Sequence, residues 1–182
     1  MGVTRVLPPG LGAGASADLA GEAGRTPLMI SAIHAHADCV RLLLGAGAAV
    51  DLIGTDIGFT PLYIACQEGQ LECVRLLLEA SAAVNQAKDG ATPLLAACGT
   101  TPTKEGHIDC VRLLLSAGAA VDLQDDVGVS PLYVAAQEDQ TDCAQLLLGA
   151  GAALLGEGAA VLVLEELEMA RARGARHRAA VG

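Results

Sequence analysis

Apolar residues recur along the chain in clusters that return at a nearly constant spacing. Four runs of three leucines, each shortly after a cysteine, lie at residues 42–44, 76–78, 113–115 and 146–148. The first run ends the heptapeptide DCVRLLL, which returns unchanged at residues 109–115. Cys39, Leu42 and Leu43 stand at i, i+3 and i+4, the spacing of one apolar helix face. Asp38 and Arg41 fall on another face, where the two charges can pair. The pattern predicts an amphipathic helix at each place.

A shorter helix is predicted before each leucine run, because a hydroxyl residue followed by proline opens every segment. The hydroxyl can cap the free amides of a helix start, and proline is favoured at the next position. These hydroxyl residues are Thr26, Thr60, Thr92 and Ser130. The glycines shortly before them, at 24, 58, 90 and 128, are 34, 32 and 38 positions apart. Such a period is typical of a repeat protein, in which each unit packs on its neighbours.

The second helix of each unit is predicted to end at a residue in the left-handed conformation, which favours glycine. Gly47, Gly118 and Gly151 occupy this position in three units, whereas the second unit has Ser81. If Ser81 adopts the same conformation, it costs about 1 kcal/mol relative to glycine.

The units follow the pattern GxTPLxxAxxxGHxxxVxxLLxxGAxVN/D, which resembles the ankyrin repeat. Thr60, Pro61 and Leu62 carry the start of the pattern in the second unit, and His107 carries its histidine in the third. The resemblance implies an all-α ankyrin-repeat solenoid of stacked helix-turn-helix units joined by hairpin-like loops. The repeat array covers residues 24–156, in units 24–57, 58–89, 90–127 and 128–156. We expect a flexible N-terminal segment over 1–23, a C-terminal capping helix over 157–173 and a basic tail over 174–182.

The units depart from the ankyrin pattern at two places. The family has histidine directly after TPL, and we expect packing to replace its polar link here, because the residues are Met29, Tyr63, Leu95 and Tyr133. The third unit carries five extra residues, 100–104, between its helices. Insertions in repeat proteins map to loops, so this one can contribute to specificity.

The charge balance excludes several classes of partner. The formal net charge is −10, whereas nucleic acids and anionic membranes are bound by basic surfaces. Residues 24–154 hold 15 acidic and 6 basic side chains, a net of −9, which would attract a partner protein with a basic surface; the alternative is that these charges only keep the surface soluble. No uncharged run reaches the roughly 18 to 20 residues that span a bilayer. We therefore expect neither a nucleic acid nor a membrane as partner.

Six cysteines without a recognisable secretory signal indicate a reducing compartment. We expect an intracellular, cytoplasmic or nuclear protein and a monomer. An adjacent acid raises the pKa of a thiol instead of activating it, so the cysteines of the leucine helices are predicted to be small buried hydrophobes. These are Cys39, Cys73, Cys110 and Cys143. Disulfides between equivalent positions are disfavoured, because packed helices lie about 8 to 10 Å apart.

No motif for catalysis or metal binding is present, and neither CxxC nor HExxH occurs. His34 and His36, two positions apart, are predicted to lie on different faces, and His107 is predicted to be structural. We expect no enzyme activity and no cofactor. Two alternatives stay open. One is a thiol-dependent redox or metal-binding role of the repeated cysteines, and the other is a scaffold fragment of a larger multidomain protein.

The resemblance implies a non-catalytic protein–protein interaction module, acting as an adaptor, inhibitor or substrate receptor. Partners of the ankyrin family contact the loop tips and the inner face of the first helices. The corresponding positions here are Arg25, Ile33, His34, Ile57, Phe59, Gln67, Glu68, Lys88, Ala91, Thr100, Lys104, Val129, Gln137 and Glu138. Phe59, the only phenylalanine, is predicted to be an aromatic anchor for the partner. The alternative is that Phe59 packs against the neighbouring loop.

Overall fold

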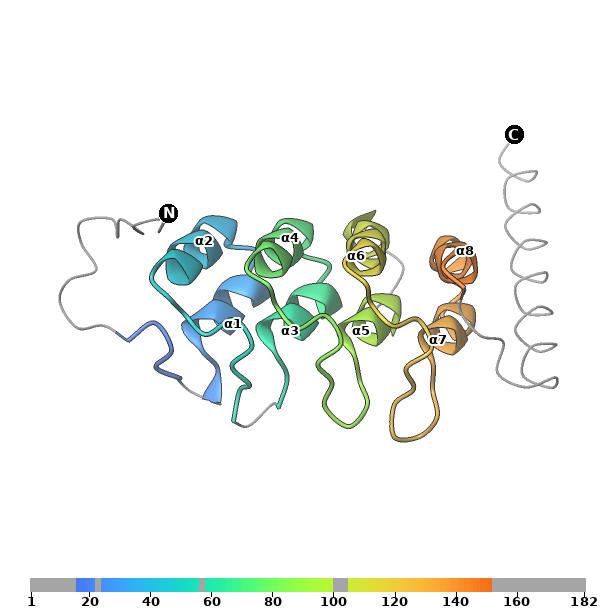
Figure 1. Cartoon of the computed structure of the whole chain (residues 1–182), viewed down its shortest axis with the longest axis horizontal. Coiled ribbons are helices and arrows are strands. Elements are labelled where there is room, and N and C mark those ends of the chain that lie inside the picture. The colour runs from blue at the N-terminus through green and yellow to red at the C-terminus, as the bar shows by residue number, and fades with distance from the viewer. Residues whose placement is uncertain (1–15, 22–23, 56–57, 100–104, 152–182) are drawn as a thin grey trace, which may run out of the picture.

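A computed structural model of the chain describes residues 16–21, 24–55, 58–99 and 105–151 (Figure 1). Within these ranges the chain forms eight helices in four pairs. The pairs are α1 (Pro27–Ile33) with α2 (Ala37–Gly45), α3 (Pro61–Gln67) with α4 (Leu71–Glu79), α5 (Pro93–Gly99) with α6 (Glu105–Ser116), and α7 (Pro131–Gln137) with α8 (Thr141–Gly149). Three predicted features lie outside the described residues: the insertion (100–104), the capping helix (157–173) and the basic tail (174–182).

The helices form two parallel rows (Figure 1). We call α1, α3, α5 and α7 the inner helices, and α2, α4, α6 and α8 the outer helices. Each helix packs on the next helix of its own row and on its partner in the pair. The loops that join successive pairs project beyond the inner row (Figure 1). This stack confirms the predicted all-α solenoid. None of the described helices is long and apolar enough to cross a bilayer.

Each inner helix begins at the predicted hydroxyl cap. Thr26 Oγ1 accepts a hydrogen bond of 3.2 Å from the backbone N–H of Met29. Thr60, Thr92 and Ser130 accept the equivalent bond from the backbone N–H three residues further along the chain, over 3.1 to 3.2 Å. All four hydroxyl residues are buried. A cap of this kind contributes about 1 kcal/mol to each seven-residue inner helix, and packing on the neighbouring helices supplies most of the remaining stability.

The outer helices end as predicted. Gly47, Gly118 and Gly151 have φ values of 92°, 85° and 87°, and Ser81 has a φ of 66°. Ser81 therefore adopts the left-handed conformation that the other units give to glycine.

Hydrogen bonds between units set the register of the stack. Asp51 Oδ1 accepts a bond of 3.0 Å from the N–H of Ala83, and Asn85 Oδ1 accepts the equivalent bond of 2.9 Å from Ala120. Asp18 makes the same bond of 2.9 Å with Ala49, which lies at the position of Ala83 in the first unit. The bonding pattern therefore extends into residues 16–21, inside the predicted N-terminal segment.

Two further bonds join the start of an outer helix to the end of the inner helix in the preceding unit. His107 Nε2 lies 3.1 Å from the carbonyl of Gln67, and its side chain is buried, as expected of a structural histidine. Gln70 Nε2 donates from the equivalent position to the carbonyl of Ile33 over 3.4 Å. A Cβ atom at Gly69 would lie 2.7 Å from His107 Cε1, so a glycine is required beside the imidazole.

The cysteines of the outer helices differ in burial. Cys73, Cys110 and Cys143 are buried, which confirms their predicted role, but Cys39 is exposed. The prediction for Cys39 is wrong because no outer helix precedes α2 within the described residues. The same absence leaves Leu42 57% exposed, whereas Leu76, its equivalent in the second unit, is 5% exposed.

Packing replaces the family histidine in only part of the array. Met29 and Leu95 are buried and Tyr63 is half-buried, but Tyr133 is 46% exposed. The expectation is therefore wrong for Tyr133, whose side chain extends from α7, the last inner helix that the structure describes.

Candidate functional site

A hollow of about 360 Å³ lies on the inner helices of the first two units. Its lining residues come from two successive loops and from the inner helices α1 and α3. They are Arg25, Ile33, Phe59, Ile64, Gln67 and Glu68, which we call the inner hollow. Five of these six are predicted contact residues, and Ile64 is the exception.

The ends of the inner helices set the length of this hollow. Arg25 and Phe59 stand directly before the caps Thr26 and Thr60, at the loop end of α1 and α3. Ile33 is the last residue of α1, and Glu68 follows the last residue of α3. From Thr60 to Glu68 a helix rises about 12 Å, at 1.5 Å per residue. The hollow therefore extends from a loop end to a helix end.

Phe59, which lines the hollow at its loop end, belongs to an aromatic stack. The rings of Phe59 and Tyr63 are stacked, with centroids 4.0 Å apart and an angle of 8° between their planes. Lys88 Nζ, from the next loop, lies 5.2 Å from the centre of the Phe59 ring. Burial raises the pKa of the Tyr63 phenol. Phe59 therefore packs against a neighbouring loop, as the alternative states, and also lines the hollow; its role as an anchor for a partner stays a prediction.

Arg25 places a positive charge at the same end. Its Nε atom is buried and has no hydrogen-bond partner. Its side chain makes no ion pair with any residue in the described part of the chain. A buried donor without a partner carries a desolvation cost.

The remaining predicted contact residues do not line the hollow. His34 caps the end of α1, Ala91 and Val129 precede later inner helices, and Gln137 and Glu138 end α7, where their side chains share a hydrogen bond of 3.2 Å. Ile57, Thr100 and Lys104 lie outside the described residues.

The structure contradicts the prediction that His34 and His36 lie on different faces. Their ring centres lie 5.8 Å apart, because the chain turns at Ala35, whose φ is 58°, and brings both rings to one side. Two rings alone do not make a metal site, and among the described residues no three His, Cys, Asp or Glu side chains come together as one.

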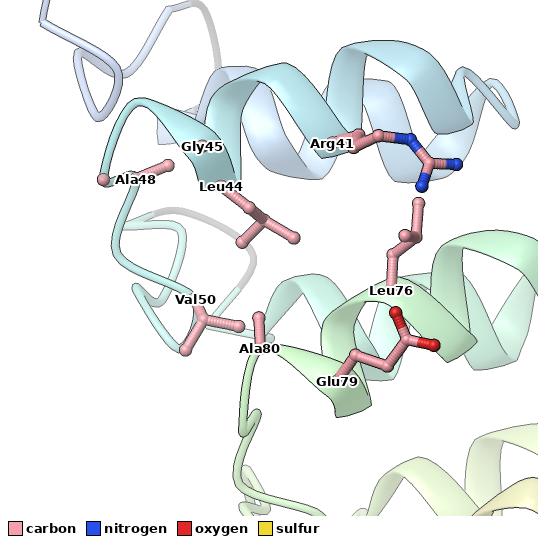
Figure 2. A pocket seen from close by; sticks show the side chains of 9 residues that line it. Arg41, Leu44, Gly45, Ala48, Val50, Leu76, Glu79 and Ala80 are labelled. Carbon is pink, nitrogen blue, oxygen red and sulfur yellow. The ribbon is translucent and has the colours of Figure 1, made fainter. Parts of the chain in front are cut away.

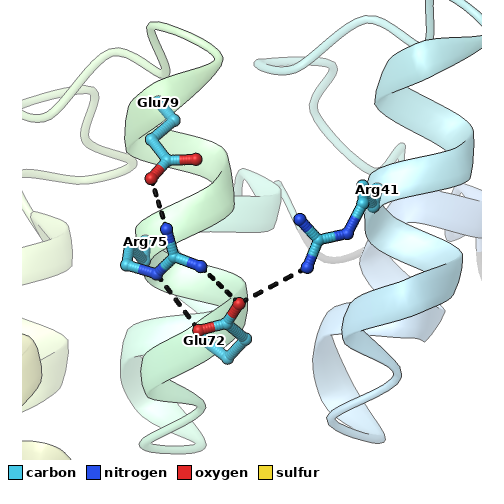
Figure 3. A network of polar contacts seen from close by, with 4 residues as sticks. All are labelled: Arg41, Glu72, Arg75 and Glu79. Atoms are coloured by element: carbon cyan, nitrogen blue, oxygen red, sulfur yellow. Dashed lines mark hydrogen bonds and ion pairs between the residues drawn. The ribbon is translucent and has the colours of Figure 1, made fainter.

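The outer helices carry an exposed charge network (Figure 3). Arg75 bonds to both Glu72 and Glu79, and Arg41 of the first unit lies 3.6 Å from Glu72 of the second. The predicted pairing of Asp38 with Arg41 is therefore wrong, since Arg41 reaches across to the next unit. Its counterparts Arg75 and Arg112 do pair at i, i+3, the latter with Asp109 over 3.8 Å.

Beside this network lies a second hollow, of about 540 Å³, between α2 and α4 (Figure 2). Leu44, Val50, Leu76 and Ala80 form apolar parts of its lining, and Arg41 and Glu79 stand at its edge (Figure 2). We call these six residues the outer hollow. Sequence reasoning missed it, although a signal exists: Gly45 stands where the next two units have Glu79 and Ser116.

The buried thiols are poor nucleophiles. All six cysteines are free. Burial is the main reason that the pKa of Cys110 rises to about 12 and that of Cys143 to about 11, and neighbouring acids raise both further. Burial also raises the pKa of Cys66, Cys73 and Cys98. These five thiols therefore stay protonated at neutral pH.

Comparison with known proteins identifies the repeat. The family model described as ankyrin repeats (3 copies) matches residues 5–88 and 81–155. A search of curated proteins returned no match. The two matched ranges cover the whole stack of paired helices, so this chain belongs to the ankyrin repeat family.

Proposed function

We propose that this chain is a non-catalytic recognition module that binds a partner protein at the inner hollow and the adjoining loop tips. Ankyrin repeats are generally protein–protein interaction modules and are typically not catalytic. The observation that carries the proposal is the convergence of Arg25, Ile33, Phe59, Gln67 and Glu68, from two units, on one hollow.

The construction of the hollow suits protein binding. The Phe59 ring stacks on Tyr63 and contacts Lys88, so less side-chain freedom remains to be lost when a partner covers it. Central, well-packed aromatic residues dominate the binding energy of many interfaces. A module with such a preformed contact can act as an adaptor, an inhibitor or a substrate receptor.

The charge of the array adds a condition on the partner. With a net of −9 over residues 24–154, long-range attraction favours an intracellular protein with a basic surface. This attraction acts mainly on the association rate and weakens as salt screens it.

Affinity capture from a cell extract with the full chain and its variants tests the proposal. Phe59→Ala removes the anchor, Tyr133→Ala removes an exposed aromatic residue of the last described inner helix, and Arg112→Ala alters an exposed outer helix. Circular dichroism checks that all variants keep their helices. We expect Phe59→Ala to lose the captured partner and the two control variants to keep it. Equal recovery with Phe59→Ala would remove the inner hollow from the binding surface.

A further inference from the structure

We propose that the inner hollow recognises an extended partner segment with an acidic residue at one end, an apolar residue in the middle and a basic residue at the other end. This inference rests on the proposed function and names the class of segment that the hollow binds.

The loop end of the hollow is positively charged, although the array as a whole is acidic. Arg25 contributes a guanidinium that makes no ion pair with any residue that the structure describes, whereas Lys88, whose Nζ lies over the Phe59 ring, already pairs with Asp89 over 4.0 Å. Arg25 is therefore the charge that a partner can use at this end. Guanidinium groups form short, charge-assisted hydrogen bonds with carboxylates. A partner carboxylate at this end would form an ion pair with the Arg25 guanidinium.

The middle of the hollow is apolar. Ile33 and Phe59 are half-buried along its walls, and Ile64 is buried beneath, with 6% exposure. An apolar side chain laid here would bury its own surface against three hydrophobic residues. Each buried methylene of such a side chain contributes about 0.8 kcal/mol in general.

The helix end of the hollow is negatively charged. Glu68 lines it and makes no ion pair with any other residue that the structure describes. Gln67, whose side chain is exposed, adds an amide beside the carboxylate. A lysine or arginine of the partner would complement Glu68 at this end.

The length of the hollow along the inner helices sets the register of the bound segment. The helix rise from Thr60 to Glu68 is about 12 Å, and an extended chain advances about 3.3 Å per residue. A segment that runs parallel to the inner helices covers this length in about four residues, so its acid and its base are expected at i and i+4. In an extended segment, residues i, i+2 and i+4 point to the same side, so the acid, the apolar residue and the base can all face the hollow.

Selection of random heptapeptides displayed on phage, with the full chain as bait, tests this inference. We expect enriched peptides to carry an acid, an apolar residue and a base at alternate positions. Synthetic copies of the peptides are then titrated against the wild type, Phe59→Ala, Arg25→Gln, Glu68→Gln and the outer-helix control Arg112→Gln. Arg25→Gln should weaken binding of the selected peptides about 10-fold, the equivalent of 1.4 kcal/mol. A peptide with glutamine in place of its acid should bind Arg25→Gln and the wild type equally well.

Two outcomes separate this inference from the proposed function. Peptides that need Phe59 but bind Arg25→Gln and Glu68→Gln as well as the wild type would overturn the charge pattern and leave the inner hollow as a binding site. Failure to select any peptide that Phe59→Ala weakens would overturn both.

Discussion

Replacing Ser81 with glycine is predicted to stabilise the array. Ser81 has a φ of 66°, in the region where a side chain on an L-residue costs roughly 1 to 2 kcal/mol. Glycine removes this cost but loses about 0.5 to 1 kcal/mol through its greater freedom in the unfolded chain. Ser81 is exposed, and its N–H donates to the carbonyl of Leu78 over 2.9 Å, a bond that glycine keeps. We therefore expect a net gain of about 1 kcal/mol.

Urea unfolding followed by circular dichroism measures this gain. With a slope of about 2 kcal/mol per molar urea, the midpoint of Ser81→Gly should rise by about 0.5 M without a change of slope. Ser81→Ala is the matched control and should leave the midpoint nearly unchanged, because alanine keeps the backbone strain. Gly118→Ser is the reverse change, and should lower the midpoint by a similar amount, since a Cβ atom there meets no neighbour. A midpoint for Ser81→Gly at or below that of the wild type would refute the reasoning.

Three further predictions concern the cysteines and the bonds between units. A thiol-reactive chromogenic disulfide should modify one cysteine rapidly in the folded chain, and Cys39→Ser should abolish this fast phase; several fast thiols would contradict the assigned burial. The urea midpoint should fall as pH rises above about 9, because thiols of the unfolded chain ionise there, whereas burial raises the pKa of the folded thiols and keeps them protonated. A midpoint that stays constant between pH 8 and 10 would disprove this linkage. His107→Ala should lower the free energy of unfolding by about 1 to 3 kcal/mol, since it leaves the Gln67 carbonyl without its partner. His107→Gln should lower the free energy of unfolding less than His107→Ala, because Gln70 donates to the Ile33 carbonyl from the equivalent position. Equal losses for the two variants in calorimetry would contradict a role for this hydrogen bond.

The fold could be predicted because its signals are local and repeat in phase. The cap at Thr60 and the left-handed residue at Ser81 depend only on neighbouring backbone groups, so a short stretch of sequence specifies them. The exposure of Cys39 could not be predicted in this way. Its heptapeptide is identical to that of Cys110, and only the helices beside each copy differ. Identical sequence therefore gave different burial, because burial depends on the position in the stack.

The candidate site, too, could be predicted from the sequence only in part. The resemblance to the ankyrin family identified Arg25, Phe59 and Glu68 as contact positions at loop tips and helix ends, and the structure brings them to one hollow. Two features needed coordinates. Arg41 pairs with Glu72 of the next unit, which no spacing within one helix reveals. The burial of Arg25 Nε without a partner depends on the three-dimensional packing around it and has no sequence signature.

The most direct test of the account is the dissociation constant of the captured partner for three versions of the full chain, measured by titration calorimetry. These are the wild type, Phe59→Ala in the inner hollow and Arg41→Ala at the edge of the outer hollow (Figure 2). We expect Phe59→Ala to raise the dissociation constant at least about 10-fold, as loss of a central aromatic contact does, and Arg41→Ala to leave it unchanged. The reverse result, with Arg41→Ala weakening the complex and Phe59→Ala neutral, would contradict recognition by the inner face.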